Sequence, residues 1–191
     1  MNWLVIDEEY LNYLRKTERR IPISNYGKDK YKPFFGILFE TTEFYYVTQV
    51  SHAQKRHIKM KNNKDFKKIY NPKDNTLLAV INLNYMFPIP KNMKVLLKYK
   101  DIEQHRSFEN NFQKSKYINL MKMELKQINK MNLESDGIFI YKNKYSILDK
   151  QLADRCIDFK QMEELARQYI KNKNSEELSA WKAVFNYLQE C

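Results

Sequence analysis

The stretch Phe34-Phe35-Gly36-Ile37-Leu38-Phe39-Glu40-Thr41-Thr42-Glu43-Phe44-Tyr45-Tyr46-Val47-Thr48 decides the fold class. Both of its ends are rich in aromatic and β-branched residues, which favour strands, and the polar segment 41–43 between them predicts a tight connection. The stretch therefore predicts a β-hairpin formed by residues 34–40 and 44–48.

Shorter apolar segments flank this hairpin in the first half of the chain. Trp3–Ile6 and Met93–Leu97 each predict a short strand, and the apolar run Leu77–Leu83 predicts a strand buried on both faces. Phe87-Pro88-Ile89-Pro90 interrupts the strand pattern, because proline lacks the N–H that a ladder needs. The first half is therefore expected to form a small, mostly antiparallel sheet.

One helix is predicted after the first strand. Asp7 is a suitable N-cap, and the apolar residues behind it share one helical face: Tyr10, Leu11 and Leu14. The helix is expected to extend to about Arg19, before Pro22 ends it.

The second half is expected to be mainly helical. Residues 102–133 contain neither proline nor glycine and predict one long helix, with a break near Ser115 as the alternative. Ser135-Asp136-Gly137 predicts a turn, and residues 138–148 fit a helix or a strand. Two amphipathic helices are expected at 159–171 and 176–188.

These elements predict one α+β domain spanning residues 1–191. The N-terminal half supplies a compact, twisted sheet with basic loops, and residues 101–191 supply the helices that cover it. A length of 191 residues and a hydrophobic content of 43% suit a single core.

Positive charge is concentrated in one quarter of the chain. The formal net charge is +11, and residues 51–100 hold twelve Lys and Arg against two Asp, a balance of +10. Eight of these bases lie between residues 51 and 73, where Asp65 is the single acid. Such a block indicates contact with a polyanion, RNA or DNA, although a solvated lysine-rich loop is the alternative.

Composition excludes several other classes of protein. The longest apolar runs, such as Phe34–Phe39, are far shorter than the ~20 residues of a membrane helix. Met1–Tyr10 contains three acids, unlike a signal peptide, so a cytoplasmic protein is expected. Two cysteines, three histidines and three glycines follow no zinc, metal or phosphate-loop motif. No metal and no cofactor are expected.

The remaining polar residues suit RNA cleavage without a metal ion. In that reaction the RNA's own 2′-OH attacks the phosphate, and the protein supplies a base, a cation for the phosphate oxygens and an acid for the leaving 5′-oxygen. Suitable Lys, His, Tyr, Ser and Thr residues gather in Thr48–Asn62, where the hairpin ends, and in Tyr26–Pro33, where it begins. Antiparallel pairing places both segments on one face.

Several segments also occur in the order typical of one known family. They are Pro33–Glu40, the block Ser51–Asn62, which ends in Arg56-His57-Ile58-Lys59-Met60-Lys61-Asn62, and Ala79–Met86 followed by Pro88. The likeness covers about residues 10–90 and recurs at Cys156–Phe159. In these features the chain resembles the ToxN/AbiQ family of endoribonuclease toxins from type III toxin-antitoxin systems.

The resemblance implies a bacterial, metal-independent endoribonuclease with a twisted antiparallel sheet similar to that of the MazF/Kid toxins. It also implies an antitoxin made of repeated, pseudoknotted RNA, which the toxin cuts into units and which inhibits it. Protein and RNA units are expected to assemble into closed oligomers, and cellular or phage RNA is the expected substrate. The implied role is phage defence by abortive infection.

The family pattern also implies the catalytic residues. Carried onto this chain, they are Ser51, Lys55, Tyr26 and Lys30, with His57 either orienting the loop or carrying a proton. Between its serine and histidine, the segment Ser51–His57 is one residue longer than the family block. An ungapped match therefore places His52 and Gln54 at the serine and lysine positions. In the earlier loop, Lys28 is the alternative to Lys30. The residues expected to bind RNA are Lys28, Lys32, Thr48, His52, Arg56, Lys59, Lys61 and Lys64.

Two other functions fit parts of the sequence. A non-catalytic RNA- or DNA-binding protein would use the same basic block only to bind phosphates, and would produce no cleavage. A structural interaction module would use the C-terminal helices and would leave the basic block without a role.

Overall fold

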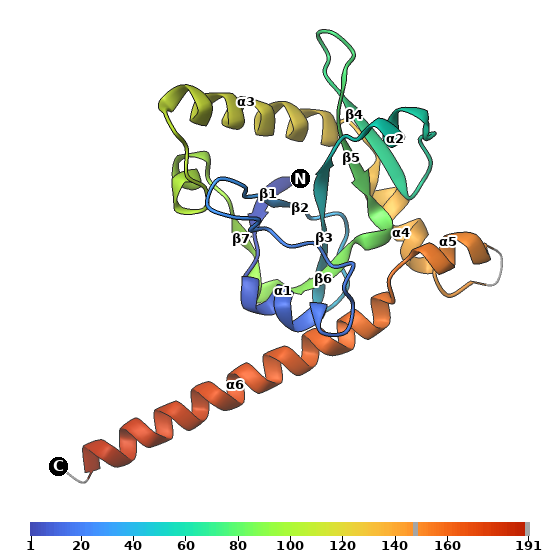
Figure 1. The fold of residues 1–191 in the computed structure, drawn as a ribbon. Coiled ribbons are helices and arrows are strands. Elements are labelled where there is room, and N and C mark those ends of the chain that lie inside the picture. Colours follow the sequence, from blue (N-terminus) through green and yellow to red (C-terminus); the bar gives the residue numbers. More distant parts are fainter. Residues whose placement is uncertain (147–148, 190–191) are drawn as a thin grey trace.

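The computed structural model describes residues 1–146 and 149–189 and contains a seven-stranded sheet (Figure 1). The strand order is β4-β5-β3-β2-β1-β7, with β6 pairing to β3, and each paired strand runs antiparallel to its neighbour. The predicted antiparallel sheet is thus confirmed. The strands are β1 (Asn2–Val5), β2 (Phe34–Gly36), β3 (Phe44–His52), β4 (Phe66–Tyr70), β5 (Leu77–Asn82), β6 (Phe87–Pro90) and β7 (Val95–Leu96).

The long strand β3 organises this sheet. Its residues 44–47 pair with β6, Thr48 and Gln49 pair with β2, and residues 50–52 pair with β5. The predicted hairpin is confirmed, but β2 ends at Gly36 instead of Glu40. Beyond Gly36 the chain follows β3 only through isolated bonds, such as Leu38 N–H to the Tyr46 carbonyl oxygen at 2.9 Å.

Two strands were not expected from the sequence. β4 lies within the basic residues 51–73, which were predicted as a loop. Its Lys68 is buried, and the ammonium group of Lys68 donates to the Ile58 carbonyl oxygen at 2.9 Å. β6 contains Pro88 and Pro90. Proline has no backbone N–H to donate. These prolines are tolerated because β6 pairs with β3 along one side only, and alternate residues of β6 need no N–H there.

Helices cover the sheet on several sides. They are α1 (Glu8–Arg15), α2 (Lys55–Lys59), α3 (Asn111–Ile128), α4 (Leu133–Asn143), α5 (Lys150–Arg155) and α6 (Phe159–Gln189), with short 3₁₀ segments at 83–85, 91–93 and 99–104. Within the described residues, none of these helices has both the length and the apolar character of a membrane span.

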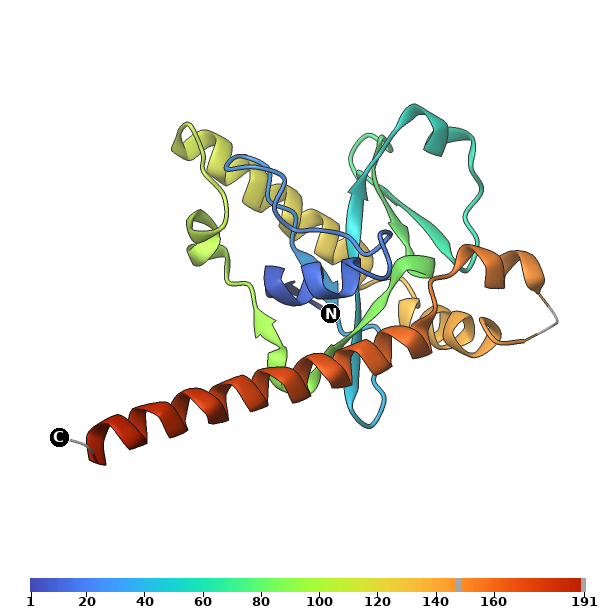
Figure 2. The same ribbon diagram turned by 60° about the horizontal axis from the view of Figure 1, so that its bottom comes forward.

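The helices and the sheet share one hydrophobic cluster. The Trp3 indole N–H of β1 donates to the Met121 carbonyl oxygen of α3 at 3.2 Å. Tyr10 of α1 lies edge-on to Tyr169 of α6, with 5.1 Å between the ring centroids. Figures 1 and 2 show that α6 starts against the body of the molecule and then extends well beyond it.

The structure corrects several predicted helix boundaries. α1 ends at Arg15 instead of Arg19, and α3 begins only at Asn111, where the Asn110 side chain caps the helix by accepting from the Gln113 N–H at 2.9 Å. α6 is one continuous helix where two were predicted. Residues 138–143, which fitted either element, are helical, whereas 147–148 lie outside the described residues.

The predicted turn at residues 135–137 lies inside α4. Gly137 is present because the helix backbone approaches an aromatic ring: a Cβ at this position would lie 3.1 Å from a ring carbon of Phe39. The Phe39 ring in turn stacks on Tyr46 of β3, with centroids 4.5 Å apart. Close packing, and not turn formation, is the reason for this glycine.

Candidate functional site

The segment of residues 24–32, hereafter the Tyr26 loop, forms a small, tight hairpin before β2. Asn25 and Tyr31 make a bridge, and the Tyr26 N–H donates to the Lys30 carbonyl oxygen at 2.9 Å. Gly27 has a φ of 127°, a backbone conformation that favours glycine, and its N–H donates to the Asn25 side chain at 2.9 Å. The loop therefore has a defined shape with Lys28 and Asp29 at its tip.

Gln49 of β3 holds both ends of the Tyr26 loop. Its buried side-chain amide donates to the carbonyl oxygens of Ile23 and Lys32, each at 2.9 Å. From the other side, the Glu8 carboxylate of α1 accepts from the Ser24 hydroxyl and, at 3.0 Å, from the Asn25 N–H. The Gln49 bonds attach the loop directly to β3, which leads into the basic residues 51–64, and the Glu8 bonds attach it to α1.

Ser51 follows Gln49 by two residues on the same strand. Side chains at positions i and i+2 of a strand face the same side, so Ser51 faces the side on which Gln49 holds the Tyr26 loop. Ser51 is half-buried and pairs with Val80 of β5. The sequence-based expectation that the two polar segments share a face agrees with this geometry.

Residues 51–64, hereafter the basic segment, leave β3 and form the short helix α2. Figure 1 shows α2 next to the hairpin formed by β4 and β5. Lys55 is the first residue of α2 and is exposed, as is Lys30 in the Tyr26 loop. Within residues 1–146 and 149–189, no hydrogen bond or ion pair joins the side chains of Ser51, Lys55, Tyr26 and Lys30 to one another, and the Tyr26 phenol makes a hydrogen bond with the backbone of Ile23.

His57 is buried at the base of α2. Its Nδ1 accepts the Gln54 backbone N–H at 3.1 Å, and its ring lies against Phe66, with centroids 5.7 Å apart. Burial lowers the pKa of His57, and the nearby charges of Arg56 and Lys68 lower it further. The imidazole is therefore held neutral, with its proton on Nε2, and its contacts fit the role of orienting the loop.

Tyr26 is half-exposed on the Tyr26 loop. The Lys32 ammonium group lies 4.7 Å from the centroid of the Tyr26 ring. Partial burial raises the pKa of the Tyr26 phenol above its ordinary value. The phenol is therefore protonated at neutral pH, and it can donate a hydrogen bond or a proton but does not serve as a base.

Most residues expected to contact RNA are accessible. Lys64 is one of them, and its ammonium group lies 3.3 Å from the ring centroid of Phe139 on α4. Lys32 is partly buried, whereas the others are exposed: Lys28, His52, Arg56, Lys59, Lys61 and Lys64.

The predicted RNA contact at Thr48 is wrong. This residue was expected at the RNA-contacting surface, but it is 1% exposed and its hydroxyl donates to the Asn82 carbonyl oxygen at 3.3 Å. The cause is strand alternation: Thr48 faces the opposite side of β3 from Gln49 and Ser51. Its position rules out direct contact with RNA in this structure.

Gln49 and Lys68 are the contributors to the site that the sequence reasoning missed. Gln49 stands among apolar and aromatic residues of a strand, and a polar residue in such a run was the available signal. Among the residues that the structure describes, no group of three His, Cys, Asp or Glu side chains lies close enough to hold a metal ion.

The sequence matches the family model "Toxin ToxN, type III toxin-antitoxin system" over residues 2–167. The chain belongs to this family. The match contains the Tyr26 loop, the basic segment and the whole sheet, so both parts of the candidate site lie in the family's own fold. No curated protein matches the chain in sequence.

Solved structures share the ToxN-family fold. The structure of AbiQ, a lactococcal anti-phage endoribonuclease of the type III toxin-antitoxin system, superposes with a TM-score of 0.68 at 18% identity, covering 89% of this chain and 98% of AbiQ. A bacterial type III toxin described as selectively inhibited by a non-coding RNA pseudoknot has a TM-score of 0.69 at 21% identity, covering 88% and 98%.

A third structure comes from a bacterial antiviral system that is regulated by a processed non-coding RNA. Its TM-score is 0.67 at 20% identity, and the alignment covers 87% of this chain and 98% of the other. The family model confirms the predicted family, and the solved structures confirm the predicted antiparallel sheet with helices. The predicted likeness to the sheet of the MazF/Kid toxins stays a prediction.

Proposed function

We propose that this chain is a sequence-specific endoribonuclease toxin that cleaves RNA without a metal ion. One observation carries the proposal: Gln49 attaches the Tyr26 loop to β3 on the face of Ser51, beside the basic segment, whose five Lys and Arg residues have no acid among them. This attachment supports a site in which a phenol, a hydroxyl and several lysines share one surface that attracts a polyanion. The description of AbiQ as an endoribonuclease supports the same activity.

In the proposed reaction, the 2′-OH of the RNA attacks the adjacent phosphate. The new bond from the 2′-oxygen to phosphorus forms as the 2′-OH proton passes to solvent water, the bond from phosphorus to the 5′-oxygen breaks, and that oxygen takes up a proton, leaving a 2′,3′-cyclic phosphate and a 5′-OH. Lys55 and Lys30 stabilise the negative charge on the phosphate oxygens. Tyr26, whose phenol is protonated, donates toward the leaving oxygen, and Ser51 orients the 2′-OH. His57 is a positioning residue, since its Nδ1 bond holds the start of α2.

We also propose that this toxin is controlled by an RNA antitoxin. The antitoxin would consist of repeated pseudoknot units that the toxin cuts from a precursor, and toxin and RNA units would form a closed oligomer in the cytoplasm. The two structures described with an RNA pseudoknot and with a processed non-coding RNA support this partner. Cleavage of cellular or phage RNA after release of the antitoxin would give abortive infection.

The direct test is incubation of the purified protein with RNA in the presence of EDTA. We expect cleavage to continue, and mass spectrometry to find cyclic phosphate and 5′-OH ends. Abolition of cleavage by EDTA, and its restoration by a divalent metal, would reject the metal-free reaction. Salt-sensitive binding with no cleavage under any condition would instead identify a non-catalytic nucleic-acid-binding protein.

The site residues are tested by single substitutions. Ser51→Ala and Lys55→Gln should each reduce cleavage at least ~100-fold, since each removes a group that acts on the reacting atoms. Lys150→Gln, which removes the same charge from an exposed position on α5, is the matched control. A Ser51→Ala protein as active and as toxic on expression as the unmodified chain would remove Ser51 from the site.

A further inference from the structure

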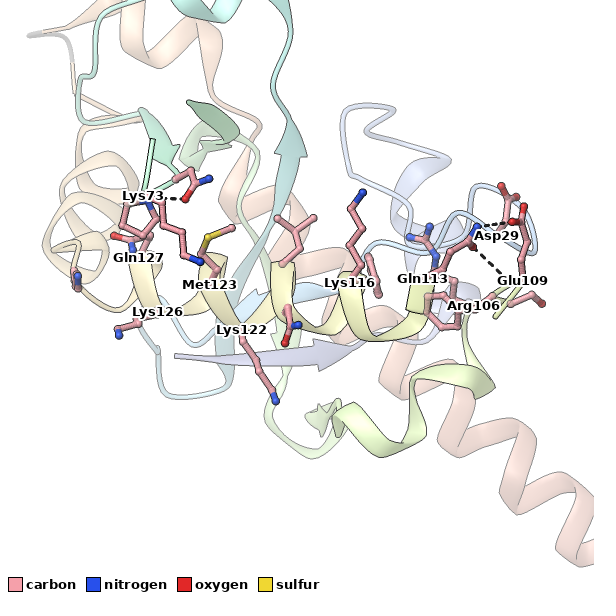
Figure 3. Close-up of a pocket in the computed structure, with 18 residues that line it drawn as sticks. Asp29, Lys73, Arg106, Glu109, Gln113, Lys116, Lys122, Met123, Lys126 and Gln127 are labelled. Atoms are coloured by element: carbon pink, nitrogen blue, oxygen red, sulfur yellow. Dashed lines mark hydrogen bonds between the residues drawn. The ribbon is translucent and has the colours of Figure 1, made fainter. Parts of the chain in front are cut away.

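A groove runs along the exposed side of α3, apart from the basic segment (Figure 3). Its volume is about 1500 Å³. One end is closed by Asp29 of the Tyr26 loop and by residues 106–109, and the other by the turn between β4 and β5 at residues 71–73. From Gln113 to Gln127 the helix side of the groove measures ~21 Å, which accommodates several nucleotides of an extended strand.

Positive charge dominates the lining of this groove. Asp29 and Glu109, its two acids, both lie at one end. The cations come from three separate parts of the chain and are distributed along its length: Lys73, Arg106, Lys116, Lys122, Lys126 and Lys130. The overall charge of the second half of the chain gives no sign of this surface, because most of the acids there lie outside the groove.

The groove also contains a cluster of three flat groups, hereafter the platform. The Arg106 guanidinium lies 4.2 Å from the ring centroid of Tyr117 and 5.4 Å from that of Phe108, and the two rings are 5.7 Å apart. The Nε of Arg106 is buried and, within the described part of the chain, lacks a hydrogen-bond partner. Leu120 and Met123 continue an apolar floor beside this platform.

We infer that the α3 groove binds a single-stranded segment of RNA, with phosphates on the lysines and a base on the Arg106–Tyr117 platform. Aromatic and guanidinium planes bind bases that are already unstacked, whereas a duplex keeps its bases stacked inside and has no use for an apolar floor. The inference rests on the proposed function, since it takes RNA as the ligand of the site.

The groove is physically joined to the candidate site. The Ser107 N–H donates to the Lys28 carbonyl oxygen at 2.7 Å, so the tip of the Tyr26 loop forms the boundary between the two. A strand lying in the α3 groove therefore ends beside the loop that carries Tyr26 and Lys30. The groove holds the RNA that flanks the cleaved phosphate and extends the contact well beyond the reacting nucleotides.

The test measures binding of a 2′-O-methyl RNA strand, which lacks the attacking 2′-OH and stays intact. The triple variant Lys73→Gln, Lys116→Gln, Lys126→Gln should bind this strand at least ~10-fold more weakly. A plot of the logarithm of its binding constant against the logarithm of the salt concentration should have a slope that is less steep by about two. The control triple variant Lys142→Gln, Lys150→Gln, Lys160→Gln removes three exposed lysines from outside the groove. It should bind like the unmodified chain.

The platform is tested separately by Arg106→Lys, which keeps the charge and loses the planar group. This variant should bind a normal strand more weakly and should bind a strand with abasic nucleotides as the unmodified chain does. Unchanged binding by the groove triple variant, or equal loss in both triple variants, would overturn the inference. So would a loss confined to duplex RNA.

These outcomes are separate from failure of the proposed function. A protein that does not cleave RNA in EDTA fails the first test, yet its affinity for the 2′-O-methyl strand is still measured. Conversely, a protein that cleaves RNA normally and binds equally well without the groove lysines keeps the proposed function and loses this inference.

Discussion

The side-chain amide of Gln49 donates a 2.9 Å hydrogen bond to the carbonyl oxygen of Lys32, and so fixes the end of the Tyr26 loop to the middle of β3. A second bond from the same amide, to Ile23, fixes the beginning of the loop. One buried side chain thereby joins the two ends of the loop. The position of Tyr26 relative to Ser51 depends on these two bonds together with those that Glu8 and Ser107 make to the loop.

Substitution Gln49→Leu should therefore reduce activity more than stability. It leaves two carbonyl groups without their buried donor, which we expect to lower the free energy of unfolding by about 2 kcal/mol. RNA cleavage should fall at least ~10-fold in protein that thermal denaturation shows to be folded, because the loop is no longer held. Gln151→Leu, at an exposed amide of α5, is the control. Undiminished cleavage by Gln49→Leu would show that the loop is positioned by other contacts.

His57 should make stability depend on pH below neutrality. Because burial lowers its pKa in the folded state, the unfolded chain takes up a proton first as the pH falls through about 6.5. The stabilisation is complete above that pH and is lost progressively below it. Thermal denaturation between pH 7.5 and 5.5 measures this loss, and His57→Asn, which keeps an acceptor near the position of Nδ1 but does not titrate, should lose this part of the pH dependence.

The same variant separates the two roles of His57. A positioning residue replaced by Asn should retain part of the cleavage and leave the pH profile of cleavage unchanged. Loss of all activity together with a changed pH profile would show that His57 carries a proton in the reaction.

Glu124 of α3 should make the opposite contribution to stability. Burial raises the pKa of its carboxyl group to about 7. A pKa raised by folding stabilises the protein at low pH, and this contribution is lost as the pH rises through about 7. Glu124→Gln should therefore raise the free energy of unfolding by about 2 kcal/mol at pH 8 and have little effect at pH 4. Denaturation at the two pH values checks this, and equal effects at both would contradict it.

Gly137→Ala should destabilise α4 although alanine favours helices. The added methyl group meets the Phe39 ring at 3.1 Å, and this ring is held between Tyr46 and Tyr141, so it cannot move away freely. We expect a net loss of about 1 kcal/mol, since the overpacking outweighs the gain in helix propensity. Ser135→Ala, at an exposed position of the same helix, should be neutral or stabilising. Stabilisation by Gly137→Ala would show that the ring adapts.

Sequence patterns predicted those parts of the fold that local chemistry determines. The aromatic strands around residues 34–48 and the apolar strand β5 were predicted because their residues match a strand locally. β4 was missed because lysines make up two of its five residues, although Phe66 and Ile69 are both buried. Gly137 was misinterpreted because its reason, the Phe39 ring, lies about a hundred residues away in the sequence.

The candidate site was predictable to a similar extent. Antiparallel pairing was enough to bring the Tyr26 loop and the basic segment to one face, but the side of the strand that Thr48 occupies depends on register and was not evident. The α3 groove was not predicted, because its cations come from β4–β5, from residues 106–109 and from α3. Only the folded chain brings these three parts together.

The bonds from Gln49 reach carbonyl oxygens, which every residue carries whatever its side chain. The bonds from Gln49 therefore place few demands on the side chains of the loop, whose shape depends instead on Gly27 and on the bridge between Asn25 and Tyr31. Lys28 and Asp29, at the exposed tip, can vary while the anchorage of the loop is kept. Under the proposed function, a change of these two residues would alter the RNA preference and leave Tyr26 and Lys30 in place.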